Sequence, residues 1–258
     1  MFTTNNCITP IDILKYYIPR VEDTLIIPIP STKDIAEIIS KSKATHSVGN
    51  NIITMAVIKK LSPKIVPHIT HLITRIIVTE TYPDILKVTR ITPNLKSEKD
   101  SYSIDSYRPI CNLSVIDKII QQYLKNHIVA FFDIHNVLHE NHHGSRKKHS
   151  TVTALAAINY HMTIPYHNNN ITAIIQTDLS CAFDTVDTTI LLDKMQYYGI
   201  RGSTSNLLKS VLSNRYQYVS IDGIESTVLQ SPQCSVLQGS KLSSVLYNTF
   251  GLNAVLWY

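Results

Sequence analysis

Two carboxylates in the second half of the chain have a spacing that could support chemistry. Asp178 follows an apolar run over residues 171–175, and Asp184 comes shortly afterwards, behind Phe183. The apolar run predicts a strand over residues 171–178, and a carboxylate at the end of a buried strand is costly unless a metal ion or hydrogen bonds receive it. From these residues alone, Asp178 is either a metal ligand or the cap of the following turn. Asp184 is more typical of a turn or helix cap than of a metal ligand.

A basic loop and a group of histidines offer two other kinds of site. Arg146, Lys147 and Lys148 lie together and could contact nucleic-acid phosphates, with a solvated charge cluster as the alternative. The histidines within residues 135–149 invite a zinc interpretation. Their spacing fits no standard ligand pattern and no cysteine joins them, so we do not predict a zinc site.

Helices with scattered strands must position these residues. Capping patterns at Ser31 and Ser114, each with an aspartate three residues later, predict the starts of two helices. The order of elements favours an α+β fold. Helices are predicted over residues 31–42, 52–61, 68–79, 114–131, 151–163, 188–198, 203–212 and 239–250, and strands over residues 85–95, 171–178, 215–222 and 225–234, the last two forming a hairpin around Asp222 and Gly223.

The composition is that of a folded, mildly basic protein. The chain has 258 residues, of which 44% are hydrophobic and 17% charged, enough for one large domain or two modest ones with a real core. The net charge of +5 suits a polyanionic partner without requiring one. The four cysteines are scattered, which favours a reducing compartment. We see neither a signal peptide nor an apolar run as long as a membrane span, and expect an intracellular protein, cytoplasmic or nuclear, with no membrane partner.

Several stretches, in order along the chain, resemble one family. Residues 178–184 read Asp-Leu-Ser-Cys-Ala-Phe-Asp, and a Gln-Gly-Ser run follows at residues 238–240. Further matching stretches are residues 106–110, 144–151, 197–202 and 213–219. Together they resemble the reverse transcriptases of non-LTR (LINE-type) retrotransposons over about residues 31–250. Several boxes in the right order are more specific than any single short pattern.

This resemblance implies the α+β fold of right-hand polymerases, with helical fingers packed on an antiparallel palm sheet. It suggests an irregular N-terminal segment over residues 1–30, a fingers-like helical region with the fingers–palm boundary over residues 31–170, a partial palm over residues 171–250, and a divergent tail over residues 251–258.

The resemblance also implies roles for single residues. Asp178 matches the first catalytic carboxylate, a Mg²⁺ ligand, with the carbonyl of Leu179 beside it. Phe183 matches the aromatic residue that lies under the sugar and excludes a 2′-hydroxyl, with ordinary core packing as the alternative. Gln238 matches a residue that contacts the incoming nucleotide, and Gly239 lets the backbone approach closely, with a helix start as the alternative.

Two basic residues match positions that meet the triphosphate. Arg108 suits bidentate phosphate contact. For Lys96, a solvated loop lysine is the alternative. In the family context, the basic loop at Arg146, Lys147 and Lys148 would contact the template–primer.

The implied reaction is RNA-directed DNA polymerisation. Its partners would be an RNA template, a DNA primer and deoxynucleotides, and Mg²⁺ ions would assist nucleotidyl transfer. The sequence departs from the family at Ser145, Cys181 and Leu237, and it contains no Tyr/Phe-x-Asp-Asp box. We therefore expect a copy truncated before that box and inactive as it stands. The alternative is a non-catalytic retroelement remnant that binds RNA or DNA through its basic surface.

Overall fold

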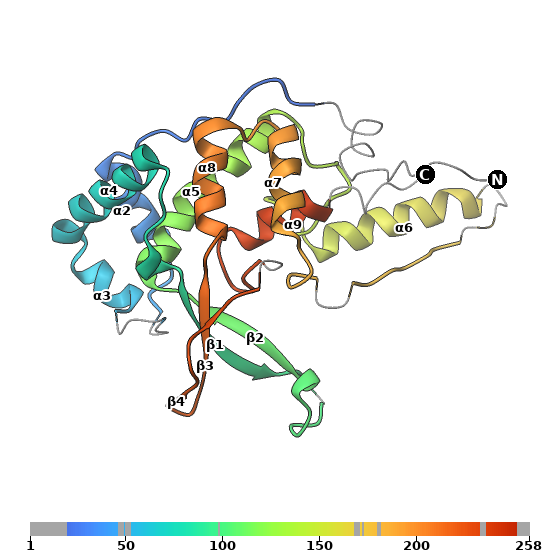
Figure 1. Cartoon of the computed structure of the whole chain (residues 1–258). Coiled ribbons are helices and arrows are strands. Elements are labelled where there is room, and N and C mark those ends of the chain that lie inside the picture. Colours follow the sequence, from blue (N-terminus) through green and yellow to red (C-terminus); the bar gives the residue numbers. More distant parts are fainter. Residues whose placement is uncertain are drawn as a thin grey trace, which may run out of the picture.

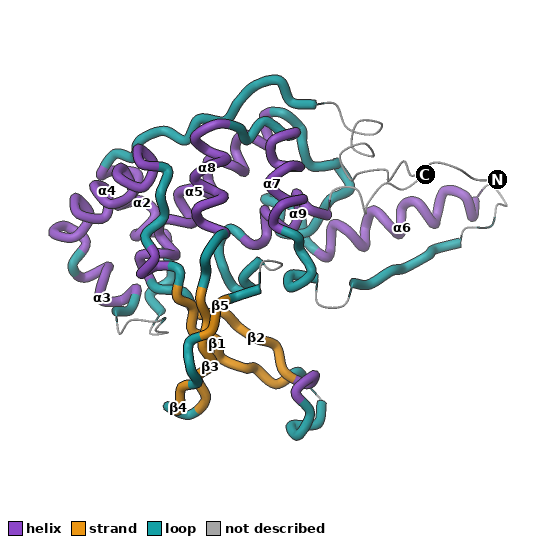
Figure 2. The backbone as a smooth tube through the Cα atoms, in the orientation of Figure 1, coloured by secondary structure: helices purple, strands orange, loops and turns teal. Residues whose placement is uncertain are grey.

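The computed structural model describes residues 20–45, 49, 53–97, 99–167, 171, 173–179, 182–232 and 236–251. Helices form one body, and a small sheet projects from it (Figure 1, Figure 2). This mixture of packed helices and strands confirms the predicted α+β class. Most of the predicted N-terminal segment, nearly all of the predicted tail, and Cys181 lie outside the described residues.

The helical body is built around α5. The helices are α2 (Thr32–Lys41), α3 (Met55–Lys60), α4 (Ser62–Thr79), α5 (Val115–Ile134), α6 (Thr151–His167), α7 (Thr188–Tyr197), α8 (Gly202–Leu212) and α9 (Ser243–Gly251), with 3-10 turns at Asp84–Leu86 and Ile104–Ser106. Helices α2 and α9 both contact α5, and α8 contacts α4 and α7. Ile35, Ile73, Ile120 and Leu208 are fully or almost fully buried in the shared core. Each such side chain stabilises the fold by roughly 1.5–3 kcal/mol.

Most helices start close to the predicted residue, although α3 begins at Met55 instead of residue 52 and α9 at Ser243 instead of residue 239. Ser31 and Asp34 form the complete predicted capping box. Ser114 accepts the backbone N–H of Asp117, but the Asp117 carboxylate bonds to buried partners instead of returning to the cap. The predicted break before α4 is wrong, because that helix begins at Ser62. Pro63 lies in its first turn, where a missing N–H costs little, and the helix continues through Pro67.

The sheet is mixed, with strand order β2-β1-β3-β4 and β5 also paired to β3. Strand β1 (Val88–Leu95) pairs antiparallel with β2 (Tyr107–Asn112) and parallel with β3 (Tyr216–Ile221). The prediction of an antiparallel sheet is therefore wrong for the β1–β3 pair. The chain between those two strands passes through α5, α6, α7 and α8, since parallel neighbours need a long crossover.

The predicted hairpin at Asp222 and Gly223 is present. Strand β3 pairs antiparallel with β4 (Ile224–Glu225), and both turn residues have positive φ, 50° and 84°, as a two-residue type I′ turn requires. The second predicted arm, residues 225–234, is interrupted: β4 ends at Glu225, and β5 covers only Leu229–Gln230. Its last two residues lie outside the described part of the chain.

The predicted strand over residues 171–178 is absent among its described residues. Residues 171 and 173–179 form no helix or strand, and Ile171, Ile174 and Ile175 are all exposed. Figure 1 shows this segment, which leads from α6 toward α7, well apart from the sheet. A strand persists by pairing with a neighbour, and no described strand pairs with these residues.

Helix α6 projects from the body in Figure 1. Its apolar residues include Val152, Leu155 and Ile158, all of which are exposed. In the described part of the chain, no helix has both the length and the apolar character that crossing a membrane requires.

Candidate functional site

The predicted Gln238–Gly239 pair forms a tight turn against strand β2. The backbone N–H of Cys111 donates to the carbonyl of Gln238 at 2.8 Å. Gly239 has φ 109°, and a Cβ built there would lie 2.9 Å from the Cys111 carbonyl oxygen. A side chain at position 239 would therefore be both strained and in collision. The sequence predicted that the backbone approaches another group closely at Gly239. In the structure that group is the Cys111 carbonyl.

Helix α5 holds the same turn from the other side. The side-chain carbonyl of Gln121 accepts from the Ser240 hydroxyl at 2.6 Å and from the Lys241 N–H at 3.1 Å. Its amide group donates to Asp117 at 2.7 Å. Gln121 is buried, so this side chain links the turn to the interior of the helical body.

Asp117 is the centre of a buried polar cluster. Tyr82 donates its hydroxyl to one carboxylate oxygen, and Arg215 lies 3.5 Å from the other. Burial raises the pKa of Asp117, and the positive charge of Arg215 opposes that shift. Arg215 also donates to the Val211 carbonyl at 2.9 Å. Sequence reasoning missed this cluster, because Asp117 was interpreted as a cap and Arg215 only as part of a family box.

The backbone of Phe183 bonds to a residue that shortly precedes the Gln238–Gly239 turn. Its carbonyl accepts from the N–H of Val236 at 2.8 Å, two residues before Gln238. Its ring packs on Tyr247 of α9, with ring centroids 4.9 Å apart. The structure therefore brings Phe183 into contact with Val236 and Tyr247, which are distant from it in the sequence.

Asp184 is a turn residue, in agreement with one of its two predicted roles. The cap of α7 is instead Asp187, which accepts the N–H groups of Thr189 and Ile190. Partial burial raises the pKa of Asp184, and its charge contributes to a raised pKa of Cys111. Burial is the main reason that the Cys111 pKa rises, to about 11. Asp184 therefore lies close enough to Cys111, which contacts the turn, to affect the pKa of the Cys111 thiol.

Asp178 and Leu179 are exposed members of the irregular segment 173–179. Within the described residues, no three His, Cys, Asp or Glu side chains are arranged to hold a metal ion. Among the described residues, no contact joins Asp178 to the Gln238–Gly239 turn.

Lys96 and Arg108 lie at the same end of the β1–β2 pair. The N–H of Lys96 donates to the Ser106 carbonyl at 2.8 Å, and its ammonium donates to the Asp105 carbonyl at 2.7 Å. Arg108 is exposed on β2, three residues before Cys111. At about 3.3 Å per residue, that places Arg108 about 10 Å along the strand from the turn.

The basic loop leads from α5 to α6. Arg146 donates to the His139 carbonyl at 2.8 Å, while Lys147 and Lys148 are exposed. The loop is tied to α9 through Asn248, which donates to the Gly144 carbonyl at 2.8 Å. It is therefore a separate surface from the Lys96–Arg108 pair.

Comparisons with known proteins point to the same family as the sequence motifs. The family model described as "Reverse transcriptase (RNA-dependent DNA polymerase)" matches residues 96–255. The chain is 25% identical over 224 residues to "Probable RNA-directed DNA polymerase from transposon BS" of Drosophila melanogaster, covering 84% of this chain and 24% of that protein.

Two further relatives show the same pattern. The chain is 27% identical to "Probable RNA-directed DNA polymerase from transposon X-element" of Drosophila melanogaster, covering 83% of this chain and 23% of that protein. It is 24% identical to "RNA-directed DNA polymerase from mobile element jockey" of Drosophila funebris, covering 84% of this chain and 24% of that protein. The chain thus spans about a quarter of the length of the curated relatives it matches.

Proposed function

Because this chain belongs to the reverse transcriptase (RNA-dependent DNA polymerase) family, we propose that it forms the nucleotide-facing part of a retrotransposon RNA-directed DNA polymerase. The supporting observations are that the Phe183 carbonyl accepts from the N–H of Val236, two residues before Gln238, and that the backbone of Gly239 packs closely against Cys111. A backbone turn that carries no side chain allows a close approach, which is what an incoming nucleotide would need. Residues 31–170 would act as fingers with the fingers–palm boundary, and residues 171–250 as a partial palm.

The proposed roles follow the positions of the side chains. Phe183 excludes the 2′-hydroxyl by its bulk, and Gln238 contacts the nucleotide. Arg108 and Lys96 contact the triphosphate, for which the forked guanidinium of Arg108 is suited. The basic loop at Arg146, Lys147 and Lys148 contacts template and primer phosphates. The partners would be an RNA template, a DNA primer and deoxynucleotides, in the cytoplasm or the nucleus.

The proposed metal site is incomplete in the described part of the chain. Asp178 and the Leu179 carbonyl would supply ligands for Mg²⁺, which polarises phosphate oxygens and lowers the pKa of an attacking hydroxyl. Among the described residues, no group of three or more His, Cys, Asp or Glu side chains could hold a metal ion, and the sequence contains no Asp-Asp pair. We propose that the 258-residue chain by itself does not extend a primer. With Mg²⁺, a primed RNA template and all four deoxynucleotides, extension that Asp178→Ala abolishes would contradict this.

Binding of a fluorescent deoxynucleoside triphosphate, in the presence of a primed RNA template, tests the nucleotide site directly. We expect weak but saturable binding that Gly239→Ala reduces severalfold, because the new Cβ meets the Cys111 carbonyl. Gly251→Ala is the matched control, since a Cβ there meets nothing within 4 Å. Phe183→Val should reduce the ratio of deoxynucleotide affinity to ribonucleotide affinity, because the smaller side chain would no longer exclude a 2′-hydroxyl. Equal affinity in the two glycine variants, or no saturable binding, would argue against the site.

A second candidate function is nucleic-acid binding without catalysis. The exposure of Lys147 and Lys148 favours it, because exposed cations can contact phosphates without a metal ion. This candidate predicts salt-dependent binding of RNA or DNA without saturable nucleotide binding.

A further inference from the structure

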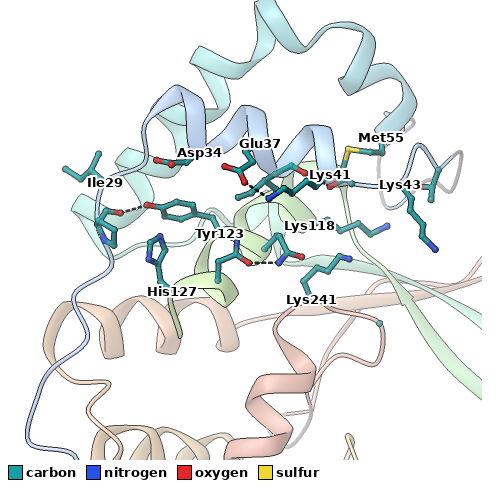
Figure 3. Close-up of a pocket in the computed structure, with 17 residues that line it drawn as sticks. Ile29, Asp34, Glu37, Lys41, Lys43, Met55, Lys118, Tyr123, His127 and Lys241 are labelled. Atoms are coloured by element: carbon teal, nitrogen blue, oxygen red, sulfur yellow. Dashed lines mark hydrogen bonds and ion pairs between the residues drawn. The ribbon is translucent and has the colours of Figure 1, made fainter. Parts of the chain in front are cut away.

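The Gln238–Gly239 turn faces an open cleft on its outer side. This cleft has a volume of about 1040 Å³, and Gly239 and Lys241 both line it (Figure 3). Figure 3 shows Lys241 at the same end of the cleft as Lys118 of α5. Burial, and then the charge of Lys241, lower the pKa of Lys118. Because the two ammonium groups repel each other, the position of the turn depends on the contacts of its inner side.

Gln121 of α5 holds the turn on this inner side. Its side-chain oxygen accepts two hydrogen bonds, from the Ser240 hydroxyl at 2.6 Å and from the Lys241 N–H at 3.1 Å. The Ser240 hydroxyl also accepts from the N–H of Leu242 at 3.2 Å. Gln121 is 1% exposed, so water is poorly placed to replace its bonds to the turn. This side chain therefore fixes the direction in which the backbone leaves Gly239.

The buried polar cluster around Asp117 fixes Gln121 in turn. The Gln121 amide group donates at 2.7 Å to a carboxylate oxygen of Asp117, which also accepts the Tyr82 hydroxyl. The N–H of Tyr82 donates to the Ser210 hydroxyl at 2.8 Å, which holds Tyr82 against α8. Because an ionised carboxylate only accepts hydrogen bonds, the NH₂ group of Gln121 must face Asp117. The Gln121 oxygen is then left to face the turn.

We propose that Gln121 is a positioning residue for the nucleotide site, and that Tyr82 and Asp117 act on the turn through it. The cluster sets the backbone direction at Gly239, and with it the access of a nucleotide to the face of the turn that carries no side chain. The choice of ligand rests on the proposed function, but the position of the turn can be measured without any ligand.

Cys111 provides that measurement, because the turn packs against it. The Cys111 N–H donates to the Gln238 carbonyl at 2.8 Å, and its side chain shares a small core cluster with Leu237, the residue before the turn. Cys111 is 7% exposed. Opening of the turn would expose the thiol, so its rate of alkylation by iodoacetamide, located by peptide mass spectrometry, measures how often the turn opens.

The first test compares Gln121→Met with Gln122→Met in the full 258-residue chain. Gln122 is the next residue of α5, and its amide group donates to Asn126 on the same helix. We expect Gln121→Met to raise the rate of Cys111 alkylation at least about fivefold, the net effect of two hydrogen bonds. It should weaken binding of a fluorescent deoxynucleoside triphosphate severalfold, and Gln122→Met should change neither quantity. An unchanged alkylation rate in Gln121→Met would overturn the proposal.

Alkylation in increasing urea separates local opening from global unfolding. A local opening exposes little surface, so its rate should depend weakly on urea, whereas global unfolding depends on it steeply. We expect the additional alkylation of Gln121→Met to lie in the part that depends weakly on urea. If all of it follows global unfolding, Gln121 has only a structural role and the proposal is wrong.

A gentler variant keeps the proposal testable even if Gln121→Met does not fold. Tyr82→Phe removes only the hydroxyl that Asp117 accepts. Tyr198→Phe is the matched control, since Tyr198 is equally buried and its hydroxyl has no hydrogen-bond partner among the described residues. We expect Cys111 alkylation to rise roughly two- to tenfold in Tyr82→Phe, the net effect of one hydrogen bond, and to stay unchanged in Tyr198→Phe. Equal rates in the two variants would overturn the proposal.

The two readouts distinguish failure of this proposal from failure of the proposed function. Faster alkylation in Gln121→Met, with no saturable nucleotide binding by the unmodified chain, would support the positioning of the turn and contradict the proposed function. Saturable nucleotide binding that Gln121→Met leaves unchanged would support the proposed function and overturn the positioning role of Gln121.

Discussion

Arg215 is a buried cation whose charged partner is the buried Asp117. Gln121 connects this pair to the Gln238–Gly239 turn, because it donates to Asp117 and accepts from Ser240. A buried ion pair is weak evidence for stability by itself, because both groups lose their hydration. Its value here is positional: Asp117 orients the Gln121 amide, and Gln121 then accepts from two consecutive residues of the turn.

Removing the carboxylate charge should destabilise the fold strongly. Asp117→Asn leaves Arg215 as an uncompensated buried charge, and we expect the free energy of unfolding to decrease by about 3–5 kcal/mol. Urea unfolding followed by circular dichroism measures this change. Glu37→Gln is the control, since it breaks only the exposed ion pair with Lys41 and should change stability little. Equal effects of the two substitutions would show that the buried cluster has no special role.

Among the helices and strands, some features depend on local sequence signals and others on long-range contacts. The hairpin between β3 and β4 forms where Asp222 and Gly223 accept positive φ. Helix α5 carries residues for two purposes: Ile120 for the core and Gln121 for the turn. Because these two residues are neighbours in sequence but point to different surroundings, one helix joins the core to the turn.

The hairpin turn should be sensitive to backbone conformation alone. Gly223 has φ 84° and no atom within 4 Å of an added Cβ. Gly223→Ala should therefore lower the free energy of unfolding by about 1–2 kcal/mol through strain and not through collision. Gly251→Ala is the matched control, since its Cβ also meets nothing but its φ is not positive. Similar melting temperatures for the two variants would contradict the prediction.

The loop between α5 and α6 should contribute to nucleic-acid binding by charge. Neutralising it as Arg146→Gln/Lys147→Gln/Lys148→Gln should reduce the salt slope for a primed template by about one unit for each phosphate that the loop no longer neutralises. Fluorescence anisotropy across a salt series measures the slope. The control replaces three exposed lysines elsewhere, Lys60, Lys64 and Lys209, with glutamine. If both triple variants keep the slope of the unmodified chain, the loop is not a contact surface.

The whole molecule combines a well-packed helical body with an exposed apolar arm. The body buries its apolar residues in one shared core. By contrast, α6 and segment 173–179 expose many of theirs, including Val152 at 72%, Leu155 at 65% and Ile175 at 71%. A helix that is apolar on all sides is ordinarily buried, and a large exposed apolar surface marks a site of association.

The 258-residue chain should therefore self-associate. We expect the weight-average sedimentation coefficient to rise with protein concentration, because burying these side chains against another copy removes apolar surface from water. Val152→Glu/Leu155→Glu should suppress the rise. The control Val78→Glu/Ile85→Glu changes apolar residues that are just as exposed, at 59% and 79%, but lie outside α6. A single monomeric species at every concentration would refute the idea.

The sequence by itself determined the family, the α+β class and the local structure that depends on near neighbours. The capping box at Ser31, the turn at Asp222 and Gly223, and the long helix after Ser114 were all predictable. Each depends on side chains or backbone angles within a few residues, or on a helical period. The family motifs were recognisable because they occur in order along the chain.

Only the tertiary structure decided which distant segments meet. It placed Phe183 beside Val236, Gln121 against Ser240, and Arg215 against Asp117. It also paired β1 with β3 in parallel and left residues 173–179 without a strand partner. An apolar run shows that a segment would gain from burial, but whether it becomes a strand depends on hydrogen-bonding groups that another segment must supply. The same reasoning applies to Asp178. Its residue type shows that it could bind a metal ion, but a metal site forms only where several ligands come together in the fold.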